Sequence, residues 1–137
     1  MTVAAKPKPI LDVWNRPFWN ACAENRLRLQ RCADTGKCWY PPAPVSPYSP
    51  RGAWEWVECS GRGEIVSWVV FHHNYFAGFA DELPYNVTLV RLDEGALMLT
   101  NVSGGNDRLS VGALVEVVFE DRGDAVVPVF KLAEQTR

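Results

Sequence analysis

Apolar and polar positions alternate along most of the chain after residue 50, with the period of two that is typical of a half-buried β-strand. Turns containing glycine interrupt this alternation at residues 60–63, 93–95, 104–106 and 122–124. The pattern predicts strands over residues 53–59, 64–74, 85–92, 96–102, 114–120 and 126–132. An earlier strand is predicted over residues 26–32, where Leu27 and Leu29 alternate with arginines and Gln30.

The last five of these strands fit a small closed barrel of the OB type, a fold that leaves no exposed sheet edges. The expected fold class is therefore mainly β. Residues 86–92 and 114–119 are apolar at nearly every position, so we expect one outer face of the barrel to be covered by the N-terminal helices or by another chain.

The residues before the first strand have helical spacing. Residues 1–10 contain Lys-Pro-Lys-Pro and predict a mobile or extended arm. Over residues 11–25, Pro17 interrupts the apolar positions, which predicts two short helices joined by a bend. The apolar positions are Val13, Trp14, Phe18, Trp19, Cys22 and Ala23.

Residues 32–49 have the spacing of a zinc ribbon but lack most of its ligands. A structural zinc site takes four soft ligands from two Cys-x-x-Cys knuckles, and the corresponding positions are Cys32, Thr35, Ser46 and Ser49. Hydroxyls resist deprotonation and bind zinc poorly, so we expect no tightly bound zinc. A makeshift site of Cys32, Cys38 and Cys59 is the weaker alternative. The expected parts are an arm (1–10), helices and first strand (11–31), a degenerate ribbon (32–59) and the barrel (60–137).

Charge and composition narrow the function. The 14 basic and 16 acidic side chains form no long block, which argues against an electrostatic nucleic-acid or membrane surface. No apolar run is long enough to span a membrane, and the first ten residues lack the apolar core of a signal peptide. We therefore expect a cytoplasmic protein whose four cysteines stay reduced.

Candidates for catalysis are sparse. His72 and His73 are the only histidines, and no serine or cysteine motif accompanies them, so a structural role is the favoured interpretation. Asp93 and Glu94 precede Gly95 in what reads as a solvated hairpin turn. The sequence contains no Gly-rich phosphate loop, nucleophile elbow or metalloprotease helix. We expect no catalytic residue in this chain.

Four segments together resemble a known family over residues 16–130: RPFWNACAENRLRLQRC, PPAPVSPYS, the run from EWVECSGRG to GALMLTNV, and VGALVEVVFEDRGDAVVPVF. The chain is similar to thiolase-associated OB-fold proteins with an N-terminal rubredoxin-like zinc ribbon. That resemblance implies two N-terminal helices, a ribbon and an OB barrel. It also implies a non-catalytic partner of β-ketothiolases, acyltransferases or the retro-aldolases of steroid side-chain breakdown. The family's four ribbon cysteines fall on positions 32, 35, 46 and 49, and this sequence keeps only the first.

In this interpretation the chain docks on a thiolase-like catalytic subunit, as a heterotetramer by family analogy, and helps to form its acyl-CoA site. The expected docking residues are Trp14, Phe18, Trp19, Trp39 and Tyr40. The expected acyl-CoA channel residues are Arg62, His72, Tyr75, Phe76, Phe79 and Tyr85. Two alternatives remain open: a free-standing OB module that binds nucleic acid, and a small acyl-CoA hydrolase that uses His72. Acidic residues outnumber basic ones in the predicted barrel strands, which weighs against the first.

Overall fold

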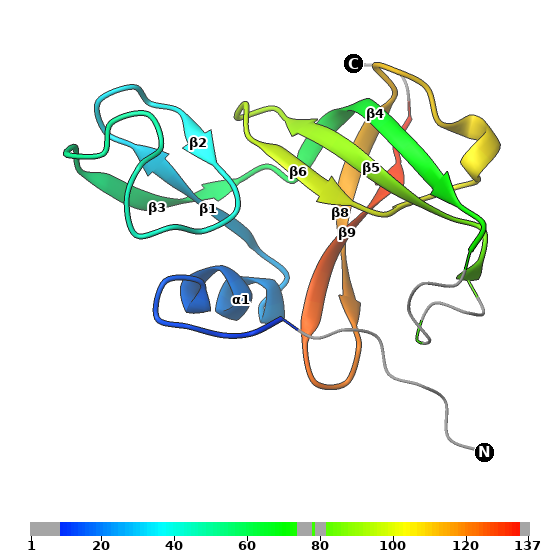
Figure 1. Cartoon of the computed structure of the whole chain (residues 1–137), viewed down its shortest axis with the longest axis horizontal. Coiled ribbons are helices and arrows are strands. Elements are labelled where there is room, and N and C mark those ends of the chain that lie inside the picture. The colour runs from blue at the N-terminus through cyan, green and yellow to red at the C-terminus, as the bar shows by residue number, and fades with distance from the viewer. Residues whose placement is uncertain (1–8, 74–77, 79–81, 135–137) are drawn as a thin grey trace.

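The computed structural model describes residues 9–73, 78 and 82–134. Figure 1 shows a small sheet and a larger, strongly curled sheet, with one helix beside them. The elements are α1 (Arg16–Ala23), β1 (Leu27–Cys32), β2 (Cys38–Trp39), β3 (Trp54–Cys59), β4 (Arg62–Phe71), β5 (Tyr85–Leu92), β6 (Leu97–Thr100), β7 (Val102–Ser103), the 3-10 helix η2 (Asn106–Arg108), β8 (Leu114–Asp121) and β9 (Val126–Leu132). In the described residues no helix is long and apolar enough to cross a membrane.

Only the second of the two predicted helices is present in the described part of the N-terminal region. The Asp12 carboxylate accepts hydrogen bonds from the backbone N–H groups of Trp14 and Asn15, both at 2.8 Å. Together with the Asp12 N–H, which donates to the Asn15 side chain at 2.8 Å, these bonds cap a single turn that leads into α1, so the prediction of a separate first helix was wrong. The helix α1 begins with Pro17 in its first turn, as expected, and buries Phe18 and Cys22 on one face.

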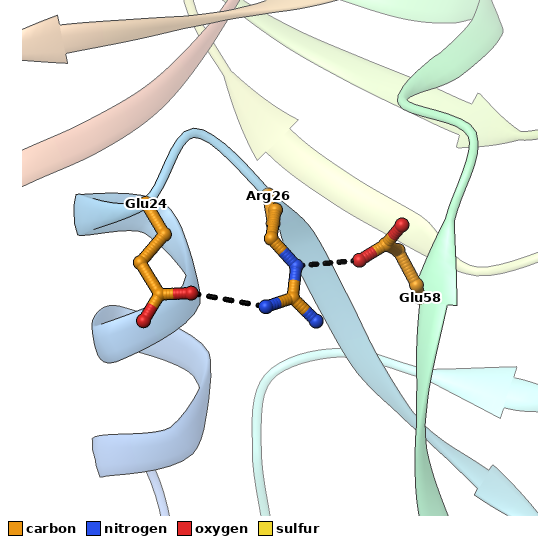
Figure 2. A network of polar contacts seen from close by, with 3 residues as sticks. All are labelled: Glu24, Arg26 and Glu58. Carbon is orange, nitrogen blue, oxygen red and sulfur yellow. Dashed lines mark hydrogen bonds and ion pairs between the residues drawn. The ribbon is translucent and has the colours of Figure 1, made fainter.

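Three charged side chains join the end of α1 to the small sheet. Asn25 has a φ of 60°, which turns the chain from α1 into β1. Figure 2 shows Arg26 donating to Glu24 of the helix end at 2.9 Å and to Glu58 of β3 at 2.6 Å. All three side chains are well exposed, so we expect each pair to contribute at most about 1 kcal/mol.

The small sheet has the strand order β2-β1-β3 and is antiparallel. Its main ladder runs from Leu27 opposite Cys59 to Cys32 opposite Trp54. The strand β1 therefore belongs to the same sheet as the predicted ribbon, and we call β1 to β3 with their connecting loops the ribbon. The short strand β2 was not predicted, because two residues are too few for a periodic pattern.

The larger sheet has six strands in the order β6-β5-β4-β8-β9-β7. Its two edge strands, β6 and β7, are consecutive in the chain and are separated by Asn101 alone. The chain thus crosses from one edge to the other, and β7 pairs in parallel with β9. This is an OB-type fold, as predicted, although the strands are hydrogen-bonded as an open, curled sheet and not as a continuous closed barrel. All of the predicted strands in this region are present.

Side-chain amides bridge the place where the curled sheet meets itself. The buried Asn86 of β5 donates to the carbonyl of Val102 in β7 at 2.7 Å and accepts from the Val102 N–H at 2.8 Å. The Asn101 amide donates to the Asn86 carbonyl at 2.6 Å, and the Asn101 carbonyl accepts from the N–H of Phe130 in β9 at 3.0 Å. These bonds replace the missing backbone ladder between β5 and β7.

One continuous core unites the helix, the ribbon and the curled sheet. It includes Phe18 of α1, Leu29 of β1, and Ile65, Val115 and Phe130 of the larger sheet, each at most 1% exposed. The helix α1 packs against β1 and β9, so it does not cover the outer face of β4, β5 and β6. Of the two expected covers for an apolar outer face, the helix α1 is therefore not the one on this face.

Replacing Asn86 by alanine should lower the free energy of unfolding by about 2–4 kcal/mol, because the Val102 N–H and carbonyl would lose buried partners. Urea unfolding followed by circular dichroism measures the change. The exposed Asn20 of α1 provides the control variant Asn20→Ala, for which we expect less than about 0.5 kcal/mol. Equal effects of the two substitutions would contradict the bridging role of Asn86.

Candidate docking surface and ribbon site

The predicted knuckle positions come together in the structure. Cys32 and Ser46 are both fully buried. Hydrogen bonds from the hydroxyls of Ser46 and Thr35 reach the Cys32 sulfur and lower the pKa of this thiol. The donor set at these positions is thus one thiol and three hydroxyls, which does not fit zinc.

The other three cysteines belong to different surroundings. Cys38 and Cys59 hydrogen-bond to each other, and the pleat of the ribbon sheet puts them on the face opposite to Cys32, since Cys38 pairs with Arg31 and Cys59 with Leu27. The alternative site of Cys32, Cys38 and Cys59 is therefore not formed. Among the described residues, no group of three or more His, Cys, Asp or Glu side chains is placed to hold a metal ion.

Most of the aromatic residues predicted for docking are used within the chain. Phe18 is fully buried, so it is not available to a partner, and Trp39 is 5% exposed. Trp19 and Tyr40 are half-buried and pack against the core, with their rings 4.9 and 5.4 Å from that of Phe18. Trp14 is 46% exposed. The helix and the ribbon contact each other through the rings of Phe18 and Tyr40, which accounts for much of this aromatic surface.

The residues predicted for an acyl-CoA channel do not form one site in the described part of the chain. Arg62 and Phe71 are the first and last residues of β4, about 30 Å apart at the rise of an extended strand. Tyr85 lies opposite Phe71, so it is at the end of β4 remote from Arg62, and His72 is exposed just beyond that end. Tyr75, Phe76 and Phe79 lie outside the described residues.

An apolar patch lies on the outer face of β4, β5 and β6, with Ser67 and Arg91 on the same face beside it. Strand register places Val69 opposite Val87, and Leu89 opposite Leu99. Val69 and Leu99 are 55% and 65% exposed, and Leu97, next along β6, is 43% exposed. We call these five apolar residues the outer sheet face. Large aliphatic side chains that adjoin in this way on a surface are typical of an interaction site.

A groove lined mostly by apolar side chains adjoins the outer sheet face. It encloses about 450 Å³ between the ribbon loop and the turn before β6, and Leu97 belongs to both surfaces. Its lining includes Trp39, Tyr40, Val45, Tyr48 and the prolines at positions 41, 42 and 47. Val45 and Tyr48 are 51% and 46% exposed. The outer sheet face and this groove, which we call the loop groove, make a single surface that spans both sheets.

A second cavity of about 370 Å³ lies where β5, β7 and β9 meet. It is lined by Tyr85 and Asn86 and by the charged residues Glu82, Glu120 and Arg122. Arg122 and Glu120 form an ion pair at 3.2 Å within it. Tyr85 thus lines a cavity, whereas the predicted channel residue Arg62 is not among its lining residues.

Comparison with known proteins identifies the family. Residues 19–53 match the model for the ChsH2 rubredoxin-like zinc ribbon domain, and residues 56–120 match the model for the ChsH2 C-terminal OB-fold domain. A chain of the solved structure named "Ltp2-ChsH2(DUF35) aldolase" superimposes with a TM-score of 0.80 at 32% identity, covering 91% of this chain and 98% of that chain. The chain belongs to the ChsH2-type DUF35 family. Its fold and the resemblance to thiolase-associated OB proteins are thereby confirmed.

Two curated relatives of this DUF35 chain are named as alpha subunits, and each is longer than this chain. The "Probable enoyl-CoA hydratase alpha subunit" of Thermomonospora curvata is 34% identical over 95% of this chain and 41% of its own length. The "3-oxo-4,17-pregnadiene-20-carboxyl-CoA hydratase alpha subunit" of Mycobacterium tuberculosis is 33% identical over 78% of this chain and 34% of its own length. The chain thus spans between a third and two fifths of these relatives.

Sequence reasoning predicted a covered apolar outer face for this DUF35 protein but did not identify which residues form it. The alternation within each strand was visible, but the face that each set of apolar residues occupies depends on strand register and on a bulge between Ile65 and Ser67 in β4. The available signal was the number of valines and leucines in adjacent predicted strands, more than one buried face of each strand needs.

All four thiols of this DUF35 chain should resist a thiol reagent at pH 8 in the native protein, because all four are buried. Burial also raises the pKa of Cys22 and of Cys59 to about 12, so both remain protonated at that pH. We expect labelling of four thiols per chain only after unfolding in guanidinium. Rapid labelling of Cys32, Cys38 or Cys59 in the native protein would contradict their burial within the ribbon.

Proposed function

We propose that this chain is an accessory subunit that docks on a thiolase-like catalytic subunit acting on CoA thioesters. The observation that carries the proposal is the match, at a TM-score of 0.80 over nearly the whole of both chains, to a chain whose structure is named as an aldolase assembly of Ltp2 with ChsH2. The names of the two curated relatives supply the class of substrate, since both are hydratase subunits for CoA thioesters.

The docking surface in this proposal is the outer sheet face together with the loop groove. Three of its residues, Val69, Leu97 and Leu99, expose large aliphatic side chains on adjacent strands. Removing apolar surface from water contributes roughly 25 cal/mol per Å², so covering this surface would stabilise a complex. Trp14 is outside this surface in the proposal, Phe18 joins the helix to the ribbon through Tyr40, and Trp39 packs against Trp54 at the base of the loop groove.

The same surface argues against nucleic acid, a negatively charged partner. Proteins that bind single strands line a basic groove with stacking aromatics. The loop groove contains tyrosines and a tryptophan but no lysine or arginine among its lining residues, and the whole chain has a net charge of −2. An apolar protein surface is the better match to it.

The cavity beside Tyr85 is the proposed place where this subunit approaches the CoA thioester. Its lining includes Glu82, which follows Tyr75, Phe76 and Phe79 closely in the sequence. In this proposal the catalytic residues come from the partner, and the present chain contributes only to the wall of the site.

Co-expression with the thiolase-like protein encoded by a neighbouring reading frame should give a complex with equal numbers of the two chains. In that complex, Leu99→Lys should weaken binding at least tenfold, about 1.4 kcal/mol, because a charge would be buried against an apolar partner. Isothermal titration calorimetry with the purified subunits measures the change.

The matched control is Val111→Lys, which places the same charge on a side chain that is 75% exposed and lies outside the outer sheet face and the loop groove. We expect this variant to bind within twofold of the unchanged protein. If Val111→Lys weakens binding as much as Leu99→Lys, the outer sheet face is not the docking surface. If no thiolase-like protein binds, and the isolated chain binds single-stranded DNA with steep salt dependence, the proposed function is wrong.

A further inference from the structure

The two knuckles of the ribbon are linked by side-chain hydrogen bonds at the positions where a zinc ribbon has its ligands. The first link joins the Ser46 hydroxyl to the Cys32 sulfur, with the Thr35 hydroxyl beside it. The second joins the Ser49 hydroxyl to the Asp34 carboxylate at 2.5 Å. Each link connects residues of the first knuckle to residues of the second, which is the mechanical task of a structural metal ion.

The Ser46 hydroxyl is held by the backbone of its own knuckle. Its oxygen accepts the backbone N–H groups of Tyr48 at 3.1 Å and Ser49 at 3.2 Å. A serine hydroxyl has one donor and two acceptor sites, so both acceptor sites are used and the donor site is left for the Cys32 sulfur. Because Ser46 is fully buried, water does not compete for these bonds.

The link between Asp34 and Ser49 depends on a glycine. A Cβ atom at Gly52 would overlap the Oδ2 atom of Asp34 and would lie 2.7 Å from the hydroxyl oxygen of Ser49. The same residue donates its N–H to the Ser49 carbonyl at 2.9 Å. Because residue 52 has no side chain, the Asp34 carboxylate fits in the space beside it.

We propose that the ribbon of this chain is cross-linked by the hydrogen bonds of Ser46 with Cys32 and of Ser49 with Asp34 in place of zinc, within a backbone that still has the ligand geometry of a zinc ribbon. The inference is independent of the docking partner. It follows that three substitutions to cysteine at the ligand positions create a zinc site, and that the unchanged protein folds without metal.

The first test is zinc binding by the triple variant T35C/S46C/S49C, which with Cys32 supplies four thiols. We expect one zinc ion per chain by inductively coupled plasma mass spectrometry after exposure to Zn²⁺, and a melting temperature that falls when EDTA is added. The unchanged protein should contain well under one zinc per chain, and EDTA should leave its melting temperature unaltered. The control S67C/S103C/S110C adds three thiols at exposed serines and should bind no stoichiometric zinc.

Two results would overturn the inference: a full equivalent of zinc in the unchanged protein, or a folded triple variant that binds no more zinc than its control. A second experiment covers the case in which the triple variant does not fold. In a double-mutant cycle, Asp34→Ala and Ser49→Ala should each lower the melting temperature by about 3–6 °C, and the double variant should fall no further than either one.

The exposed Ser110 supplies the control for this cycle, since Ser110→Ala should leave the melting temperature within about 1 °C. Gly52→Ala should reproduce the loss seen for Asp34→Ala, because the added methyl group displaces the carboxylate. Strictly additive effects of Asp34→Ala and Ser49→Ala, or no effect of either, would show that the two residues do not form a structural link and would overturn the inference.

Discussion

A single buried amide determines whether the larger sheet can curl back on itself. The edges β6 and β7 follow each other in the chain, so β5 and β7 face each other without a complete backbone ladder, and the Asn86 side chain supplies both a donor and an acceptor to Val102. The core residues Val115 and Phe130 lie inside the sheet that this closure completes. The ribbon depends on the barrel in turn, because β3 leads directly into β4 through a two-residue turn.

The packing of the ribbon gives it a share of a core that an isolated zinc finger lacks. An isolated zinc finger has too small a core to fold without its ion. Here Leu29 of β1 and Cys38 of β2 belong to the same core as Phe18 of α1 and the residues of the curled sheet. The loops that zinc would otherwise hold are fixed by buried hydrogen bonds around Ser46, and the remaining stability comes from apolar burial that the ribbon shares with the barrel.

Local patterns sufficed to predict the strands and the lost zinc ligands, because period-two alternation and ligand spacing are properties of the sequence itself. The same local patterns do not show which elements pack against each other or which side chains become buried between them. Phe18 and Trp39 are of the residue types common at interfaces, yet Phe18 is buried in the shared core and Trp39 packs against Trp54 within the ribbon. Asn86 reads as a polar interruption of an apolar strand, and only the meeting of β5 with β7 reveals its role. Asp12 and Asn15 cap a single turn before α1 through bonds that no periodicity records, where a separate helix was predicted.

The central claim is that the outer sheet face and the loop groove bind a thiolase-like catalytic subunit. Hydrogen–deuterium exchange of the chain, free and in the purified complex, tests it most directly, because it maps protection along the backbone without any substitution. The account predicts slowed exchange on binding at residues 45–48, 67–69 and 97–99, with little change at residues 115–118 of β8. Protection confined to β8 and β9, with residues 97–99 unchanged, would contradict it.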